Sequence, residues 1–61
     1  MNAKEVLKIL HGHGFSQVSQ KGSHLKLAKE GKKVIVPVHG TKYIPIGTLK
    51  SIEKQSAVKL R

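Results

Sequence analysis

The sequence contains no cysteine and no tryptophan, and it has only one phenylalanine and one tyrosine. Without cysteine the chain can form neither a disulfide nor a thiolate metal site, which fits a reducing compartment. So few aromatic residues argue against a module that holds single-stranded bases on several stacked rings. Contacts with nucleic acid are therefore expected to go mainly through backbone phosphates.

Acidic residues and long apolar runs are also scarce. Three Asp and Glu residues stand against twelve Lys and Arg, which gives a formal net charge of +9. A positive field of this size attracts nucleic acid, an anionic membrane or an acidic protein. Because no apolar run approaches the length of a signal-peptide core or a membrane span, we expect a soluble protein that stays in the cytoplasm, where it is made.

The length of 61 residues leaves room for a single domain over residues 1–61. A chain this small buries only roughly 60% of the surface that its unfolded form exposes. It can build about one layer of helices on one sheet.

The first residues have the pattern of an amphipathic helix. Asn2 and Glu5 have the spacing of a capping box. The apolar residues around them share one helical face, namely Ala3, Val6, Leu7 and Leu10. The glycines within residues 11–14 predict the end of the helix, because glycine tolerates the left-handed conformation in which helices commonly end.

From Phe15 onward the apolar residues alternate with polar ones, which predicts strands. The segments 21–23 and 29–32 have the composition of turns, and the run from Lys33 to His39 is rich in β-branched residues. Pro37 cannot donate a hydrogen bond to a ladder, so we expect this last strand to lie at an edge or to leave the sheet there.

The remaining residues predict a loop and a second helix. Residues 40–45 lack periodicity, Thr48 is the expected helix cap, and the helix is expected to run to about Ala57. The element order is then α-β-β-β-α, an α+β fold. We expect both helices to cover one face of a three-stranded antiparallel sheet and to leave the other face exposed to solvent.

The predicted turns fix a strand register. Leu25 then lies opposite Val36 and His24 opposite Pro37, so that the apolar residues share one face. His24 and His39 become diagonal neighbours on the other face, with Cβ atoms about 7–8 Å apart. A phosphate can fit between two imidazoles at that separation.

This arrangement suggests cleavage of RNA. A neutral imidazole can take the proton of a ribose 2′-hydroxyl, whose oxygen then attacks the adjacent phosphorus, and neighbouring lysines can offset the charge on the phosphoryl oxygens. The candidate catalytic base is His24, with His39 as a possible acid partner. The candidate RNA contacts are Lys21, Gly22, Ser23 and Lys26.

The same residues also have simpler interpretations. A lone surface histidine is more often an ordinary solvated residue, and a group of lysines is more often a solvated face. His11 and His13 lie two residues apart at a helix end, where side chains do not face each other, so we expect no metal site and no cofactor.

The chain resembles the HicA toxins of type II bacterial toxin–antitoxin systems. The resemblance covers nearly the whole sequence and rests on Phe15, Gln20-Lys21-Gly22-Ser23-His24, Val36-Pro37-Val38-His39, Gly47-Thr48-Leu49-Lys50-Ser51-Ile52 and Lys54-Gln55. It implies a fold like the double-stranded-RNA-binding domain, a metal-independent ribonuclease that cleaves messenger RNA, and a HicB-type antitoxin as partner. It also implies that His24, which follows the Gly-Ser pair, is the catalytic histidine.

The chain departs from the family pattern at two places. Many members carry a second histidine where this chain has Leu25, which the strand alternation directs inward. The family commonly ends its last helix with Gln-Ala-Gly, whereas this chain reads Gln55-Ser56-Ala57, so the resemblance predicts a longer helix here.

Two alternatives to the ribonuclease remain open. The first is a non-catalytic RNA-binding module of the same fold, whose lysines only contact phosphates. The second is a protein-interaction or DNA-associated component that acts only within an antitoxin complex. No recognition helix with base-reading side chains is evident for the latter.

Overall fold

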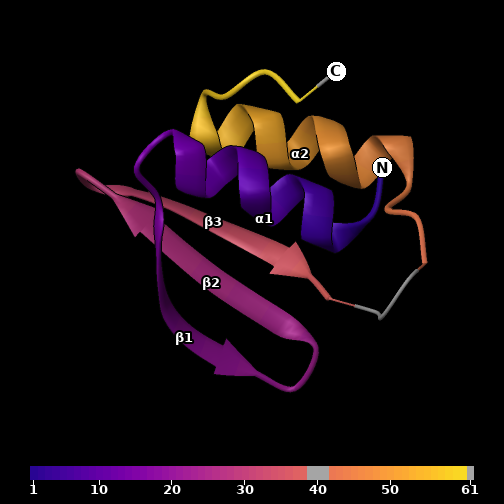
Figure 1. Cartoon of the computed structure of the whole chain (residues 1–61), viewed down its shortest axis with the longest axis horizontal. Helices are drawn as coiled ribbons and strands as arrows, with labels where there is room; N and C mark the ends of the chain where they lie inside the picture. Colours follow the sequence, from indigo (N-terminus) through magenta and orange to yellow (C-terminus); the bar gives the residue numbers. More distant parts are fainter. Residues whose placement is uncertain (39–41, 61) are drawn as a thin grey trace.

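The computed structural model describes residues 1–38 and 42–60. Its elements are α1 (Ala3–Gly12), β1 (Ser16–Lys21), β2 (His24–Lys29), β3 (Lys32–Pro37) and α2 (Ile46–Ser56). This order confirms the predicted α-β-β-β-α fold class (Figure 1). No helix within the described ranges is long and apolar enough to cross a membrane.

The three strands form an antiparallel sheet in the order β1-β2-β3. His24 lies opposite Pro37 and Leu25 opposite Val36, which confirms the predicted register. The turn between β2 and β3 sets this register: its two residues, Glu30 and Gly31, have φ angles of 47° and 86°. Two consecutive positive φ angles are typical of the type I′ turn that joins tightly paired strands.

Helix α1 begins and ends as predicted. The Asn2 side chain accepts a hydrogen bond from the Glu5 amide at 2.9 Å, and a Glu5 carboxylate oxygen accepts one from the Asn2 amide at 3.0 Å. This is a complete capping box. At the other end Gly14 has a φ of +94°, which lets the chain turn away from the helix toward β1.

Helix α2 corrects two expectations. It begins at Ile46 with Pro45 as its N-cap, and the Leu49 amide donates to the Pro45 carbonyl at 3.0 Å, so the prediction that Thr48 caps this helix was wrong. Pro45 (φ −58°) already has the φ that a helix entry requires, and it starts the ladder without a capping side chain. The helix is also not extended, because Ala57 adopts a left-handed φ of 60° that ends it at Ser56.

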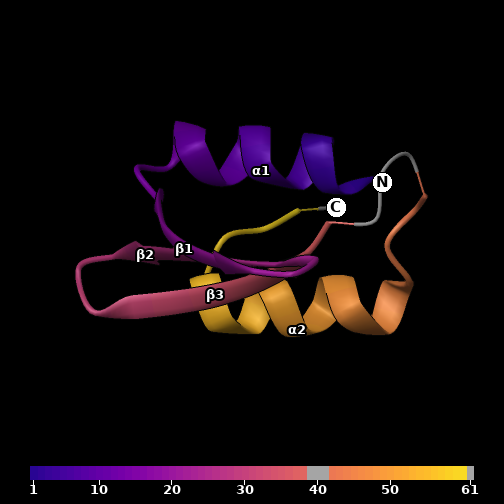
Figure 2. The same ribbon diagram turned by 90° about the horizontal axis from the view of Figure 1, so that it is seen from below.

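One hydrophobic core joins the helices, the inward face of β2 and β3, and the segment after α2. Its buried members are Ala3, Val6, Leu10, Phe15, Leu25, Leu27, Val34, Val36, Ile44, Leu49, Ile52, Val58 and Leu60. Both helices bury side chains in this cluster, α1 from above the strands and α2 from beside β3 (Figure 2). Figure 2 shows the C-terminal segment returning from the end of α2 toward α1.

Helix α2 also borders the outer edge of the sheet. The Gln55 side-chain oxygen accepts a hydrogen bond from the Ile35 amide at 3.3 Å, so α2 satisfies a donor that β3 presents at its free edge. Strand β1 has no such cover, and all six of its residues are exposed. Val18 lies in a bulge opposite β2 and is 57% exposed, so β1 contributes hydrogen bonds to the sheet but nothing to the core.

Candidate nucleic-acid interface

His24 lies on the exposed face of the sheet, between two neighbouring strands. It is the first residue of β2 and pairs with Lys21 of β1 and with Pro37 of β3. Directly opposed residues in antiparallel strands project to the same face. Leu25 is buried in the core, so the alternation along β2 turns His24 outward, where it is exposed.

A second lysine shares this face. Lys26 follows His24 by two positions on β2, a separation of about 7 Å along a strand. It lies opposite Ser19 of β1 and Ile35 of β3. The structure therefore brings Lys21, His24 and Lys26 together on one face of the sheet.

Two hydrogen bonds, one from β1 and one from the residue after β3, fix the turn before His24. The Gln20 side chain donates to the Gly22 carbonyl at 3.1 Å, and the Val38 amide donates to the Ser23 carbonyl at 2.6 Å. Gly22 has a φ of +59°, and a β-carbon at this position would meet nothing within 4 Å. Glycine is thus required by the backbone conformation and not by crowding, and the backbone of this turn is open to a ligand.

His39, the predicted acid partner, lies outside the described residues. Its part in the site remains a prediction.

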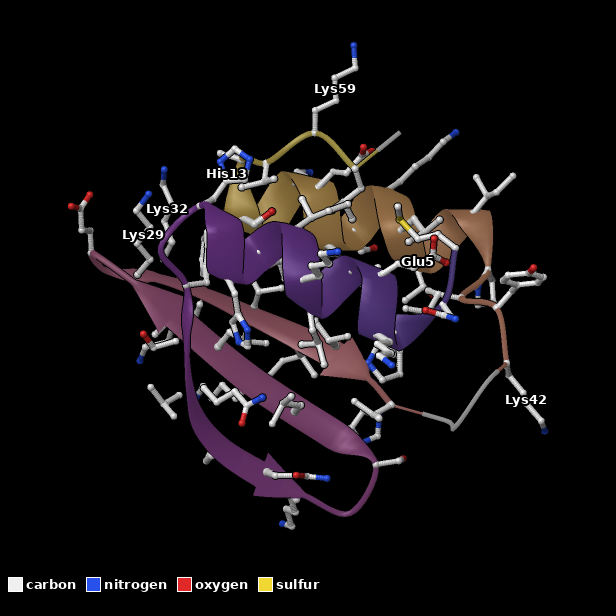
Figure 3. All side chains as sticks on the ribbon, in the orientation of Figure 1. Glu5, His13, Lys29, Lys32, Lys42 and Lys59 are labelled. Carbon is white, nitrogen blue, oxygen red and sulfur yellow. The ribbon has the colours of Figure 1, made fainter. Side chains whose placement is uncertain are left out.

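The lysines at the opposite end of β2 and β3 belong to a different region. Lys29 pairs with Lys32 beside the second turn, and Figure 3 shows both at the end of the molecule opposite Lys42. The Lys29 ammonium group donates to the His13 carbonyl and lies 6.0 Å from the centre of the Phe15 ring. Lys29 thus stabilises the junction between α1 and β1 and does not extend the surface around His24.

The sequence predicts a loop over residues 40–45 and indicates no functional side chain there. In the structure Tyr43 is 78% exposed. It borders a pocket of about 300 Å³ whose other walls come from Pro37, Lys42, Ile44 and Pro45. The sequence feature that could have indicated a binding site here is the chain's one tyrosine, which follows a lysine.

Within the described ranges, no group of three or more His, Cys, Asp or Glu side chains gathers in a way that could hold a metal ion. The chemical groups around His24 on the exposed sheet face include the imidazole itself, the ammonium groups of Lys21 and Lys26, and the turn at Gly22. This set can bind a phosphate and exchange a proton with it or with a neighbouring hydroxyl.

Comparison with known proteins gives two matches that agree with each other. Residues 3–58 match the family described as "HicA toxin of bacterial toxin-antitoxin". The chain is also 37% identical over 59 residues to a protein of Pseudomonas fluorescens (strain Pf0-1) named "Probable mRNA interferase HicA". That alignment covers 97% of this chain and 98% of the relative.

Proposed function

Since the chain belongs to the HicA toxin family of bacterial toxin–antitoxin systems and is thereby a toxin with endoribonuclease activity, we propose that it cleaves messenger RNA with His24 as the general base. The observation that carries this proposal is the place of His24 on the exposed sheet face, paired with Lys21 and two residues from Lys26. We place the activity in the cytoplasm, where messenger RNA is translated.

The proposed reaction needs only the substrate's own nucleophile and a protein base. The neutral imidazole of His24 accepts the proton of a ribose 2′-hydroxyl, and that oxygen attacks the adjacent phosphorus. The bond from phosphorus to the 5′-oxygen breaks, which leaves a 2′,3′-cyclic phosphate and a 5′-hydroxyl. The departing oxygen takes a proton from an acid, for which His39 is the candidate, and the reaction requires no metal ion.

The two lysines support this reaction electrostatically. Negative charge accumulates on the phosphoryl oxygens as the 2′-oxygen attacks, and cations held nearby stabilise that charge. Lys21 lies directly opposite His24 on β1, and Lys26 lies two positions further along β2 on the same face. The space beside Gly22, where an added β-carbon would meet nothing within 4 Å, lets a phosphate approach from the direction of the turn.

The proposed partner is a HicB-type antitoxin. A positive surface around His24 suits an acidic partner that associates quickly and in a salt-dependent way. A stable interface covers about 800 Å² of each partner, which is about a fifth of the 4194 Å² exposed by this chain. A partner of ordinary size can therefore cover His24 and exclude the substrate.

The test is cleavage of a labelled messenger RNA in excess chelator, with wild type and His24→Ala compared at the same salt concentration. We expect His24→Ala to lose at least about 10²–10⁴-fold in rate and to retain most of its RNA affinity. His11→Ala, which changes an exposed histidine on α1, is the matched control. Equal cleavage by wild type and His24→Ala would refute the role of His24. If the wild type bound RNA without cleaving it, the protein would instead be a non-catalytic RNA-binding module.

A further inference from the structure

We propose that Tyr43 and the pocket beside it form a subsite for one nucleobase of the RNA strand that lies against His24. This inference rests on the proposed function, because it needs an RNA strand at His24. It adds a stacking contact to a surface that otherwise offers mainly phosphate contacts.

Tyr43 is the ring that this chain exposes. The sequence has one phenylalanine, one tyrosine and no tryptophan, and Phe15 is 3% exposed within the core. Tyr43 is 78% exposed, so its side chain is accessible to a ligand. Bases of single-stranded RNA stack on such rings, and one ring accommodates one base.

The walls of the pocket have the character of a base-binding site. Pro37 and Pro45 supply apolar surface above the buried Ile44, and Lys42 supplies a cation. None of the residues that line it is acidic. Figure 3 shows the Lys42 side chain projecting outward from this end of the molecule, where it can contact a phosphate next to the bound base.

Pro37 connects the pocket to the proposed catalytic residue. It lines the pocket and also lies directly opposite His24 across β2 and β3. The Cβ atoms of two such residues are about 4.5–5.5 Å apart. A strand whose phosphate lies against His24 therefore has an adjacent nucleotide beside the pocket.

The backbone that carries Tyr43 is anchored to the start of the chain. The Ile44 amide donates to the Met1 carbonyl at 2.8 Å, and Tyr43 itself forms an isolated bridge with Asn2. Asn2 is in turn fixed as the N-cap of α1. The ring is thus presented from a supported position, which lowers the entropy cost of stacking a base on it.

The first test uses an RNA oligonucleotide with a 2′-deoxy group at the cleaved position, which prevents cleavage without altering the protein. Tyr43→Ala should bind this RNA about 5- to 100-fold more weakly, as loss of one stacked base predicts. Tyr43→Phe keeps the ring and should retain most of the affinity. Ile46→Ala, which changes an exposed apolar side chain outside the pocket lining, is the matched control and should bind as wild type does.

The second test moves a single abasic nucleotide along the same RNA. Wild type should lose affinity mainly when the abasic site occupies one position near the cleaved bond. When that abasic site is combined with Tyr43→Ala, the loss of RNA affinity should be no larger than for either change alone, because both changes remove the same contact. Since Tyr43 is the chain's one tyrosine and tryptophan is absent, its fluorescence should change on binding the intact RNA and change less with the abasic RNA.

Equal RNA affinity and cleavage by wild type and Tyr43→Ala would overturn the subsite. So would a Tyr43→Ala variant that binds RNA normally but fails to bind the antitoxin, since the ring would then serve the protein partner. Failure of the proposed catalytic role has a different signature, namely cleavage by His24→Ala, and it leaves the abasic-site measurements unaffected.

Discussion

A carboxylate oxygen of Glu53 in α2 accepts a hydrogen bond from the backbone amide of Leu60 at 2.8 Å. Beside it, the buried Ser56 hydroxyl donates to the Ile52 carbonyl at 2.7 Å and accepts from the Val58 amide at 3.1 Å. These contacts turn the chain back over the core after α2, so Val58 and Leu60 are buried. The C-terminal segment is therefore part of the folded domain and not a loose basic extension.

Replacing Glu53 with alanine should lower the free energy of unfolding by about 1.5–3 kcal/mol, the usual value for a hydrogen bond to a charged group. The Leu60 amide loses its acceptor, and the C-terminal segment detaches more easily from the core. Urea denaturation followed by circular dichroism measures the effect. Glu53→Gln keeps a side-chain oxygen that can accept the hydrogen bond, so it should lower the free energy of unfolding less than Glu53→Ala does. Equal decreases for the two variants would show that this hydrogen bond does not hold the C-terminal segment.

Ala57→Gly should stabilise the protein by roughly 1 kcal/mol, because Ala57 ends α2 in a left-handed conformation that costs a residue with a β-carbon about that much. For a domain of this size the midpoint of thermal unfolding should rise by about 4–8 °C. Ser51→Gly, at an exposed position inside α2, is the control and should destabilise. A fall in the midpoint for Ala57→Gly would contradict the assigned cap.

Leu27→Ala should leave the protein largely unfolded at room temperature. Leu27 is completely buried in the core, and removing such a side chain costs about 2–5 kcal/mol. A core this small supplies only about 3–5 kcal/mol in total. Val18→Ala, at the exposed bulge of β1, should change stability by less than about 0.5 kcal/mol, and both variants can be compared by thermal melts.

The sheet register was predictable because two independent signals agree on it. Alternation places Leu25 and Val36 on the same face, and a short turn at Glu30 and Gly31 closes the hairpin in the one register that keeps them there. A slip by one residue would expose half of these side chains. The position of His24 on the outer face follows from the same two signals.

Other features were not predictable because they depend on tertiary packing. Nothing in the alternation near Val18 reveals a bulge, since a strand outside the core has no buried face to fix its register. The start of α2 at Pro45 and its end at Ala57 depend on burial of the segments on either side. The pocket beside Tyr43 forms only when the segment that carries Tyr43 and Ile44 packs against the start of the chain.

If the exposed sheet face binds RNA through phosphates, replacing Lys26 with alanine should weaken binding by a similar factor for all RNA sequences. Each lost phosphate contact also lowers the slope of log affinity against log salt concentration by about 0.7–1, because fewer counterions are released. Titrations at several salt concentrations measure both effects. Lys59→Ala is the control of equal charge: Figure 3 shows Lys59 projecting from the C-terminal segment, beyond the helices and away from the sheet. Lys59→Ala lowers the net charge by the same amount as Lys26→Ala. If both variants changed the slope of log affinity against log salt concentration equally, the effect would come from overall charge, and a phosphate contact at Lys26 would be refuted.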